Sequence, residues 1–238
     1  MAFNLPGISQ IDLDPETAAL IFRGEISSWA DPRIAALNEN VDLPDMAITP
    51  VHRSDDSGTT ENFTDYVHAT APGTWTEEAG GSWPSELGGE NAKGNSGVMS
   101  TVTRTEGAIG YVDDSVTGDE AGKARLKVGD HFVEVGAEAA AKAVEAASQV
   151  EGAGENDLAL DLDRTTTAAG AYPLVLVSYQ MYCTSYVDAN TVELVKAFGG
   201  HVVSEEGQSL AAESVGSAPM PDALAEKAQA AIGSISRR

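Results

Sequence analysis

The chain has 238 residues, enough for one large domain or two small ones, and 42% of them are hydrophobic, which indicates a globular protein. Its 37 acidic residues against 14 basic ones give a formal net charge of −23, a field that argues against nucleic-acid and anionic-membrane partners. The one cysteine, Cys183, excludes an internal disulfide and any multi-cysteine metal site, and its apolar surroundings predict a buried structural thiol.

The N-terminal part of the chain carries clear strand and helix signals. Residues 2–7 alternate briefly and end in a Pro-Gly turn, which predicts a short strand. A capping aspartate followed by a proline predicts two helices, one from Asp14 to Gly24 and one over 31–37. Residues 46–51 predict a strand that leads directly into a loop, and helical spacing of apolar residues begins after Ser57.

The remaining segments alternate between helix and strand patterns, which predicts a mixed α/β fold. In chain order, we expect a glycine-rich surface loop over 80–97, a helix over 98–105, a strand over 108–112, a hairpin over 124–135, a helix over 137–148, a buried strand over 172–183, a helix over 190–200 closed by glycines, and a final helix through Ile235. The stretch 161–173 is a candidate boundary between two lobes.

The junction between the strand and the helix near Ser57 has the composition of an anion site. A strand that leads into a helix presents the first N–H groups of the helix, and the helix dipole adds to their attraction for an anion. Gly58 permits close approach and unusual backbone angles, while Ser57, Thr59 and Thr60 supply hydroxyl donors. The pattern therefore predicts that a small anion binds at the start of this helix.

An arginine stands beside these hydroxyl residues. Arg53 supplies a permanently charged fork suited to an oxyanion, and Asp55 is placed to hold that fork in position. The pattern alone leaves a second interpretation open, in which Ser57 and Glu61 only cap the helix. It also leaves open a hydrolase in which Ser57 reacts with the help of His52, although a serine at a helix start more often caps.

The stretch "HRSDDSGTTENFTDYV" resembles the signature of the phosphate-binding proteins that serve ABC-type phosphate importers, the PstS family. Other segments agree in the same order, among them "AFNLPG", "IFRGEISSWADPRIAALN", "KGNSGV" and "GAIGYV". The resemblance implies an α/β fold of the periplasmic-binding-protein-like type II class. It implies that residues 1–169 form the second, phosphate-loop lobe, and that 170–238 form the hinge strand and the C-terminal part of the first lobe.

The resemblance also implies roles for individual residues. It assigns phosphate binding to Arg53, Ser57, Gly58 and Thr59, and it assigns supporting roles to Asp55, Asp56 and Thr60. Asp55 matches an aspartate that pairs with the arginine. Asp56 stands where the family often has glycine, and we expect aspartate to tolerate the left-handed backbone angles of that position.

The function that the resemblance implies is binding of inorganic phosphate for an ABC transporter, without catalysis or a cofactor. The partners implied are phosphate and the membrane subunits of the transporter, in an extracytoplasmic location, although the first residues show no export signal. The family's N-terminal segment is not recognisable in the chain, so we expect apolar surface near 174–182 to be exposed unless a second copy or a separate N-terminal segment completes the first lobe.

Three alternatives remain at this stage. The chain could bind another tetrahedral oxyanion, it could be a truncated fragment that binds nothing, or it could be the Ser-dependent hydrolase described above. A metal site is not predicted: Asp157, Asp161 and Asp163 lie close in sequence, but the stretch lacks the glycine and the final glutamate of a calcium loop.

Overall fold

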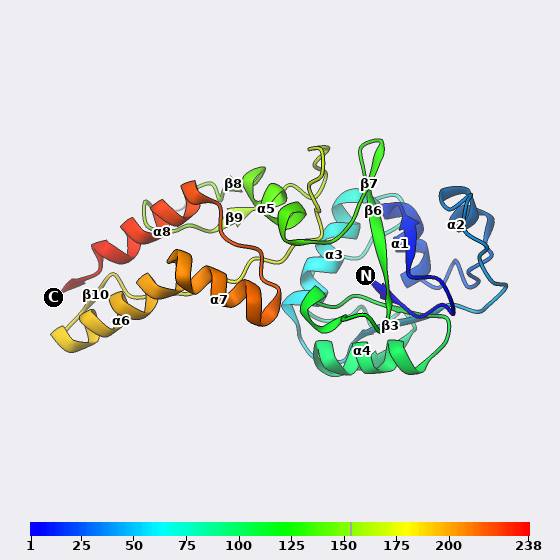
Figure 1. The fold of residues 1–238 in the computed structure, drawn as a ribbon, viewed down its shortest axis with the longest axis horizontal. Coiled ribbons are helices and arrows are strands. Elements are labelled where there is room, and N and C mark those ends of the chain that lie inside the picture. Colours follow the sequence, from blue (N-terminus) through cyan, green and yellow to red (C-terminus); the bar gives the residue numbers. More distant parts are fainter. Residues whose placement is uncertain (153) are drawn as a thin grey trace.

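A computed structural model describes residues 1–152 and 154–238, which form two parts arranged along the long axis of the molecule (Figure 1). One part holds the N-terminus, a large sheet and the helices that cover it; the other holds the last helices and ends at the C-terminus, at the far tip. The predicted α/β fold class is confirmed by this arrangement. Among the residues described, no helix has both the length and the apolar character needed to cross a membrane.

A mixed sheet forms the centre of the N-terminal part. Its strands are β1 (Ala2–Phe3), β2 (Gln10–Leu13), β3 (Thr49–Arg53), β4 (Glu90–Ala92), β5 (Ala108–Gly110), β6 (Gly122–Val128) and β7 (His131–Val133). The strand order is β2-β6-β1-β5-β3-β4, with β7 paired to β6 as the predicted hairpin. Because β5, β3 and β4 pair in parallel, their carboxyl ends meet at one edge of the sheet.

Four helices cover this sheet. They are α1 (Pro15–Phe22), α2 (Pro32–Leu37), α3 (Gly58–Thr70) and α4 (Gly94–Arg104). The predicted caps are confirmed, since the side chain of Asp14 accepts a hydrogen bond from the Thr17 N–H and that of Asp31 accepts one from the Arg33 N–H. Helix α4 packs on β3 and β5, whereas α1 packs against α3 on the opposite side of the sheet (Figure 1).

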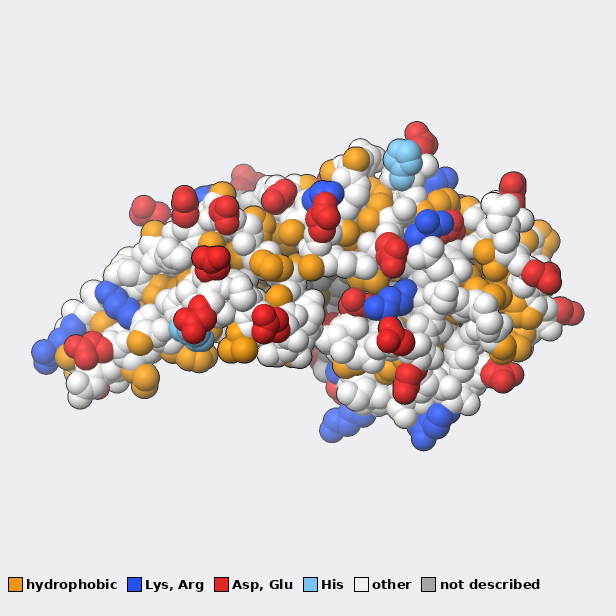
Figure 2. All heavy atoms as spheres, in the orientation of Figure 1, with side chains coloured by type: hydrophobic (Ala, Val, Ile, Leu, Met, Phe, Trp, Pro, Cys, Tyr) orange, Lys and Arg blue, Asp and Glu red, His pale blue; other side chains and the backbone are white. Residues whose placement is uncertain are grey.

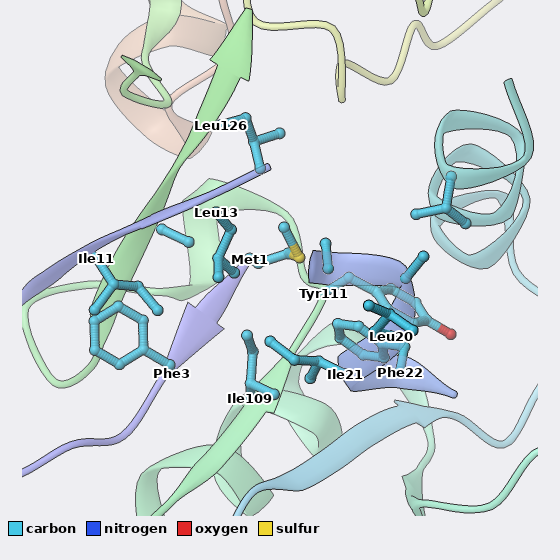
Figure 3. Packing of buried hydrophobic residues seen from close by; sticks show 14 of the residues in the cluster. Met1, Phe3, Ile11, Leu13, Leu20, Ile21, Phe22, Ile109, Tyr111 and Leu126 are labelled. Carbon is cyan, nitrogen blue, oxygen red and sulfur yellow. The ribbon is translucent and has the colours of Figure 1, made fainter. Parts of the chain in front are cut away.

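The core of this part has two layers. The larger cluster lies under α1 and α3 and includes Phe3, Ile21, Phe22 and Tyr111. In Figure 3, Ile21, Phe22 and Tyr111 lie close together, and Phe3 lies beside Ile11. A smaller cluster, which includes Val51, lies between the sheet and α4. Full burial of one such side chain stabilises a fold by about 1.5–3 kcal/mol, so both faces hold the sheet firmly in place.

The C-terminal part consists mainly of helices. Its elements, after the short 3-10 helix Asp114–Val116, are α5 (Ala137–Glu145), β8 (Ser148–Gln149), β9 (Leu160–Asp161), β10 (Ser185–Tyr186), α6 (Ala189–Val202), α7 (Glu205–Val215), α8 (Asp222–Ser234) and β11 (Ser236–Arg237). The predicted helices are confirmed, but the glycines do not close α6. Gly199 lies within it, and a side chain there would press on Ile232 of α8, which explains why a glycine stands at this contact.

Two further predictions are wrong. Residues 172–183, all of them described, lie outside every helix and strand, although the apolar run predicted a buried strand. Instead, Arg164 donates to the carbonyl groups of Pro173 and Val175, and no neighbouring strand pairs with the described segment. Cys183 is exposed rather than buried for the same reason, since no sheet covers this run.

The expected exposure of apolar surface around these residues is confirmed. Leu176, Tyr179 and Met181 are 45%, 51% and 95% exposed. A smaller correction concerns the predicted loop over 80–97, which contains β4 and the first turn of α4. Its sequence lacks apolar alternation, and β4 is defined only by its pairing with β3 at the edge of the sheet.

Candidate functional site

The side chains of β3 alternate between the two faces of the sheet as the strand approaches the loop. Val51 packs in the cluster under α4, and the next residue, His52, stacks on Trp83 with ring centroids 4.7 Å apart. Arg53 turns again toward the start of α4. The period of two therefore places the guanidinium at the carboxyl edge of the sheet, where β3 meets the first turns of two helices.

Helix α3 begins there with a partly exposed first turn, in which Gly58 is exposed while Ser57 and Thr60 are buried. The Ser57 hydroxyl accepts hydrogen bonds from the N–H groups of Thr59, at 3.1 Å, and of Thr60, at 3.4 Å, so its capping role is confirmed. Gly58 is exposed, and a side chain added to it would meet nothing within 4 Å. Its φ is not positive, so its contribution is an open approach to the helix end rather than an unusual backbone angle.

The Arg53 guanidinium faces this first turn. Its Nε and Nη2 donate to the two carboxylate oxygens of Asp55, at 2.8 and 2.7 Å, and its Nη1 donates to the Thr59 hydroxyl at 3.5 Å. The side chain is only 11% exposed, so the bidentate pair fixes one edge of the fork and leaves Nη1 at the helix start. The predicted pairing of Arg53 with Asp55 is confirmed.

The electrostatics follow from this pair. The Arg53 guanidinium, assisted by the Gly94 N–H at 3.1 Å, holds the pKa of the Asp55 carboxyl well below its usual range. Gly94 is the first residue of α4, so the beginnings of α3 and α4 meet at one carboxylate. Asp55 therefore stays ionised across the physiological range and keeps the guanidinium oriented.

Two residues near this pair do not stand out in the sequence: Asn95, which contacts Arg53, and Asp113, which contacts Asn95. The Asn95 side-chain oxygen accepts from Arg53 Nη1 at 3.2 Å, and its amide nitrogen donates to the carboxylate of Asp113. Asn95 begins α4 and Asp113 follows β5, so only the strand order brings them to Arg53. The signal available was that Asn95 lies in "KGNSGV", just before a predicted helix, and that Asp113 directly follows the predicted strand in "GAIGYV".

Thr60 and Asp56 differ from Ser57 and Thr59 in their surroundings. Thr60 is fully buried and bonds to the Tyr111 hydroxyl at 2.8 Å, which in turn accepts from the Arg53 N–H at 3.1 Å. Thr60 thus links the start of α3 to β3 through the Tyr111 hydroxyl. Asp56 is exposed and has no positive φ, so the expected left-handed backbone is not present there.

A cavity of about 460 Å³ adjoins the loop. Its lining includes Arg53, Asp55 and Asp56 but none of Ser57, Gly58 and Thr59, so it reaches only part of the candidate site. His52 lines it, with Nδ1 at 2.9 Å from the Arg53 carbonyl oxygen. Within the described residues His52 makes no hydrogen bond to Ser57, an arrangement unlike the nucleophile–base pair of a hydrolase.

Comparison with known families identifies the wider group. The family model described as a PBP superfamily domain matches residues 1–206. The chain belongs to the PBP superfamily. Its mixed sheet, with a loop and a helix start following β3 at the carboxyl edge, agrees with that membership.

Within the PBP superfamily, this chain is similar to proteins of the PstS name. Phosphate-binding protein PstS 2 of Mycobacterium tuberculosis is 34% identical over 241 residues, which cover 99% of this chain and 64% of that protein. PstS of Pasteurella multocida is 45% identical over 116 residues, covering 46% of this chain and 33% of that protein. The predicted resemblance is confirmed, and the chain spans about 64% of the length of PstS 2.

Solved structures agree in fold. A high-affinity periplasmic phosphate-binding protein solved with phosphate, PfluDING, has a TM-score of 0.70 and 20% identity, and the match covers 96% of this chain and 67% of that one. The phosphate-binding protein of Stenotrophomonas maltophilia gives a TM-score of 0.62 at 20% identity, over 96% of this chain and 66% of that one. At this identity the likeness supports the fold of this PBP superfamily member.

Proposed function

We propose that this chain binds inorganic phosphate at the start of α3 and serves as the substrate-binding component of an ABC phosphate importer. The observation that carries the proposal is the Arg53 guanidinium, held by Asp55 with Nη1 directed at Thr59 in the first turn of α3. In this proposal Arg53, Ser57, Gly58 and Thr59 contact the phosphate, and Asp55, Asp56 and Thr60 support them. The names of the PstS relatives point to the same ligand.

The chemistry fits a small tetrahedral oxyanion. Arg53 Nη1, the Thr59 hydroxyl and the Gly58 N–H at the start of α3 offer donors from several directions, and the helix dipole favours negative charge. The net charge of −23 opposes an anion, but salt screens that field beyond about 8 Å at physiological ionic strength. Close contacts therefore decide whether phosphate binds.

The affinity of the isolated chain is expected to be low. Four charge-assisted contacts at about 1.5–3 kcal/mol each contribute roughly 6–12 kcal/mol. Association costs about 4–15 kcal/mol, so the sum lies near zero or slightly on the side of binding. We expect a Kd of about 1 mM or weaker.

A titration with inorganic phosphate, followed by ¹H–¹⁵N NMR, tests the proposal. Arg53→Ala should weaken binding by roughly tenfold to a hundredfold, because it removes charge-assisted hydrogen bonds. The matched control is Arg104→Ala, which removes the same charge from an exposed position at the other end of α4. The proposal fails if the wild type shows no phosphate-dependent shifts near residues 53–60, or if both variants bind equally well.

A parallel titration with sulfate separates phosphate from other tetrahedral oxyanions. Phosphate carries a proton near neutral pH that it can donate to a carboxylate, whereas sulfate carries none. Equal affinities would identify a general oxyanion site. Tighter binding of phosphate would support the transport role.

We also propose a division of the chain near residue 169, with 1–169 as the phosphate-loop lobe and 170–238 as the hinge segment and part of the other lobe. In support, the larger core cluster and its partly buried neighbours extend no further than Leu174. Apart from Val150, the exposed large hydrophobic side chains gather beyond that point: Leu176, Tyr179, Met181, Val187, Leu194, Phe198, Leu210 and Val215.

A second copy or a separate N-terminal segment would cover that apolar surface and complete the other lobe. An extracytoplasmic location goes with this role, as in the periplasmic protein of similar fold. Sedimentation velocity at rising protein concentration tests whether a second copy covers this surface. If it does, a dimer should form as the concentration rises, and a dye that binds exposed apolar surface should bind less. A monomer at every concentration would exclude the second copy.

A further inference from the structure

The Arg53 guanidinium donates to the Asn95 amide, which in turn donates to the Asp113 carboxylate, and neither residue is among the proposed phosphate contacts. We propose that Asn95 and Asp113 act as one positioning pair, which orients Arg53 Nη1 toward the bound anion and so sets the affinity of the site. The inference rests on the proposed function, because it concerns the same arginine.

The first step is the distribution of hydrogen bonds around the guanidinium. Nε and Nη2 are committed to Asp55, so Nη1 is the nitrogen left to face the start of α3. Nη1 donates to the Asn95 oxygen at 3.2 Å and, more weakly, to the Thr59 hydroxyl at 3.5 Å. The Asn95 contact is therefore the shorter of the two that determine where Nη1 points.

The second step concerns the direction of the Asn95 amide. Its oxygen accepts and its nitrogen donates, so a rotation by half a turn would set a donor against the guanidinium, which has only donors. The carboxylate of Asp113 accepts from the amide nitrogen and so selects the orientation in which the oxygen faces Arg53. Asp113 thus acts on the anion site through Asn95.

The third step is that only an ionised Asp113 enforces this choice. A protonated carboxyl can donate as well as accept, and it would pair equally well with a rotated amide. Burial raises the pKa of Asp113, and the nearby positive charge of Arg53 opposes part of that effect. The orientation of Nη1 should therefore weaken when the solution becomes mildly acidic.

The other ionisable groups around Asp113 come from each neighbouring element. From β3 and its loop come Arg53, whose positive charge acts to lower the pKa of Asp113, and its ion-pair partner Asp55. Tyr111, at the end of β5, has a pKa raised by burial and stays neutral in acid. Asp114 turns away to Lys123 of β6, at 2.6 Å, and Lys93 before α4 is exposed.

The test measures inorganic phosphate affinity by NMR titration for Asn95→Ala, Asp113→Ala and the double variant. Each single change should weaken binding roughly threefold to tenfold, because Nη1 loses its fixed direction. The double variant should bind no more weakly than the weaker single variant, since the two side chains act as one unit. Asp113→Glu, which keeps an ionised acceptor, should restore part of the affinity, and Asp114→Asn is the matched control without effect.

A pH profile separates positioning from a merely structural role. In mildly acidic solution, the wild type should bind phosphate several times more tightly than Asp113→Asn while the pH stays above the raised pKa of Asp113, and the ratio should approach one as the pH falls below that pKa. Inorganic phosphate is mainly a monoanion over this range, and His52 is present in both proteins, so the ratio reports Asp113. A constant ratio, or additive effects of Asn95→Ala and Asp113→Ala, would overturn the inference.

The outcomes also separate the two proposals. If the wild type binds phosphate, and if Asn95→Ala and Asp113→Ala each bind it as tightly as the wild type does, the inference fails and the proposed function stands. If the wild type itself does not bind, both fail. Circular dichroism of each variant, and the ¹⁵N resonance of Arg53 Nε, would show whether a loss of affinity comes from a displaced guanidinium in a folded protein.

Discussion

The two parts of the chain bury their apolar side chains to very different degrees. In the sheet part, Phe63 and Tyr66 of α3 are fully buried; in the helical part, Leu194 and Phe198 of α6 are 69% and 55% exposed. Figure 2 shows acidic side chains over the visible face of both parts, with hydrophobic ones between them on the helical part. Local sequence signals for helices are present in both parts of the chain. They therefore predict where a helix forms, but they do not predict whether its apolar face is buried.

The difference also explains where the candidate site lies. A guanidinium can orient an anion only if its supports are fixed, and the supports of Arg53 stand on β3, α4 and the end of β5, all within the packed part. Tyr111 stacks on Phe63 at 4.7 Å and links the loop to the core. Packing in the sheet part is therefore a condition for the proposed anion binding.

The largest expected effect is a loss of stability, and it is tested by making the same phenylalanine-to-alanine substitution in each part. Phe63→Ala should destabilise the protein by about 3–5 kcal/mol, because it leaves a cavity in the core beside Phe22 and Tyr111. Phe198→Ala should cost less than about 1 kcal/mol, since more than half of that side chain already contacts water. Urea unfolding followed by far-UV circular dichroism measures both.

The outcome for Phe198→Ala would sharpen the comparison. A loss above about 2 kcal/mol that grows with protein concentration would mean that another copy covers this surface in solution. Equal losses for Phe198→Ala and Phe63→Ala at every concentration would contradict the contrast between the two parts.

Much of the local structure could be predicted because its causes are local. Asp14 and Ser57 cap helices through hydrogen bonds within three residues, and Arg53 pairs with Asp55 two positions away. By contrast, Asn95 and Asp113 reach Arg53 only because β4 and β5 flank β3, an order that no spacing reveals. The strand predicted over 172–183 does not form, because a strand depends on hydrogen bonds to neighbouring strands, which the apolar pattern of the run does not reveal.

The second prediction compares two serine caps. Ser57→Ala should destabilise the protein by about 1–2 kcal/mol, because the buried Thr60 N–H loses its acceptor in the core. Ser204→Ala removes the cap of α7, where the Ser204 hydroxyl accepts from the Gly207 N–H at 3.1 Å, and should cost about 0.5 kcal/mol. Thermal unfolding of both variants, with phosphate titration of the first, measures the difference.

The smallest effect concerns two ionised aspartates, one in each part. The Arg53 guanidinium lowers the pKa of Asp55, and hydrogen bonds from the Thr191 hydroxyl and N–H lower that of Asp188, the cap of α6. Because each folded pKa lies below the ordinary value of 3.8, each contributes stability that is present above that pH. The contribution is lost as the pH falls through the folded pKa.

Carboxyl ¹³C NMR during an acid titration separates the two cases. Arg53→Ala should raise the pKa of Asp55 most of the way toward its ordinary value, because the ion pair and two hydrogen bonds disappear together while the Gly94 N–H bond remains. Thr191→Val should raise the pKa of Asp188 by less, since it removes the hydroxyl bond at 2.9 Å and keeps the N–H bond. If Asp55 does not respond to Arg53→Ala, the pair does not hold the guanidinium, and the anion site loses its main support.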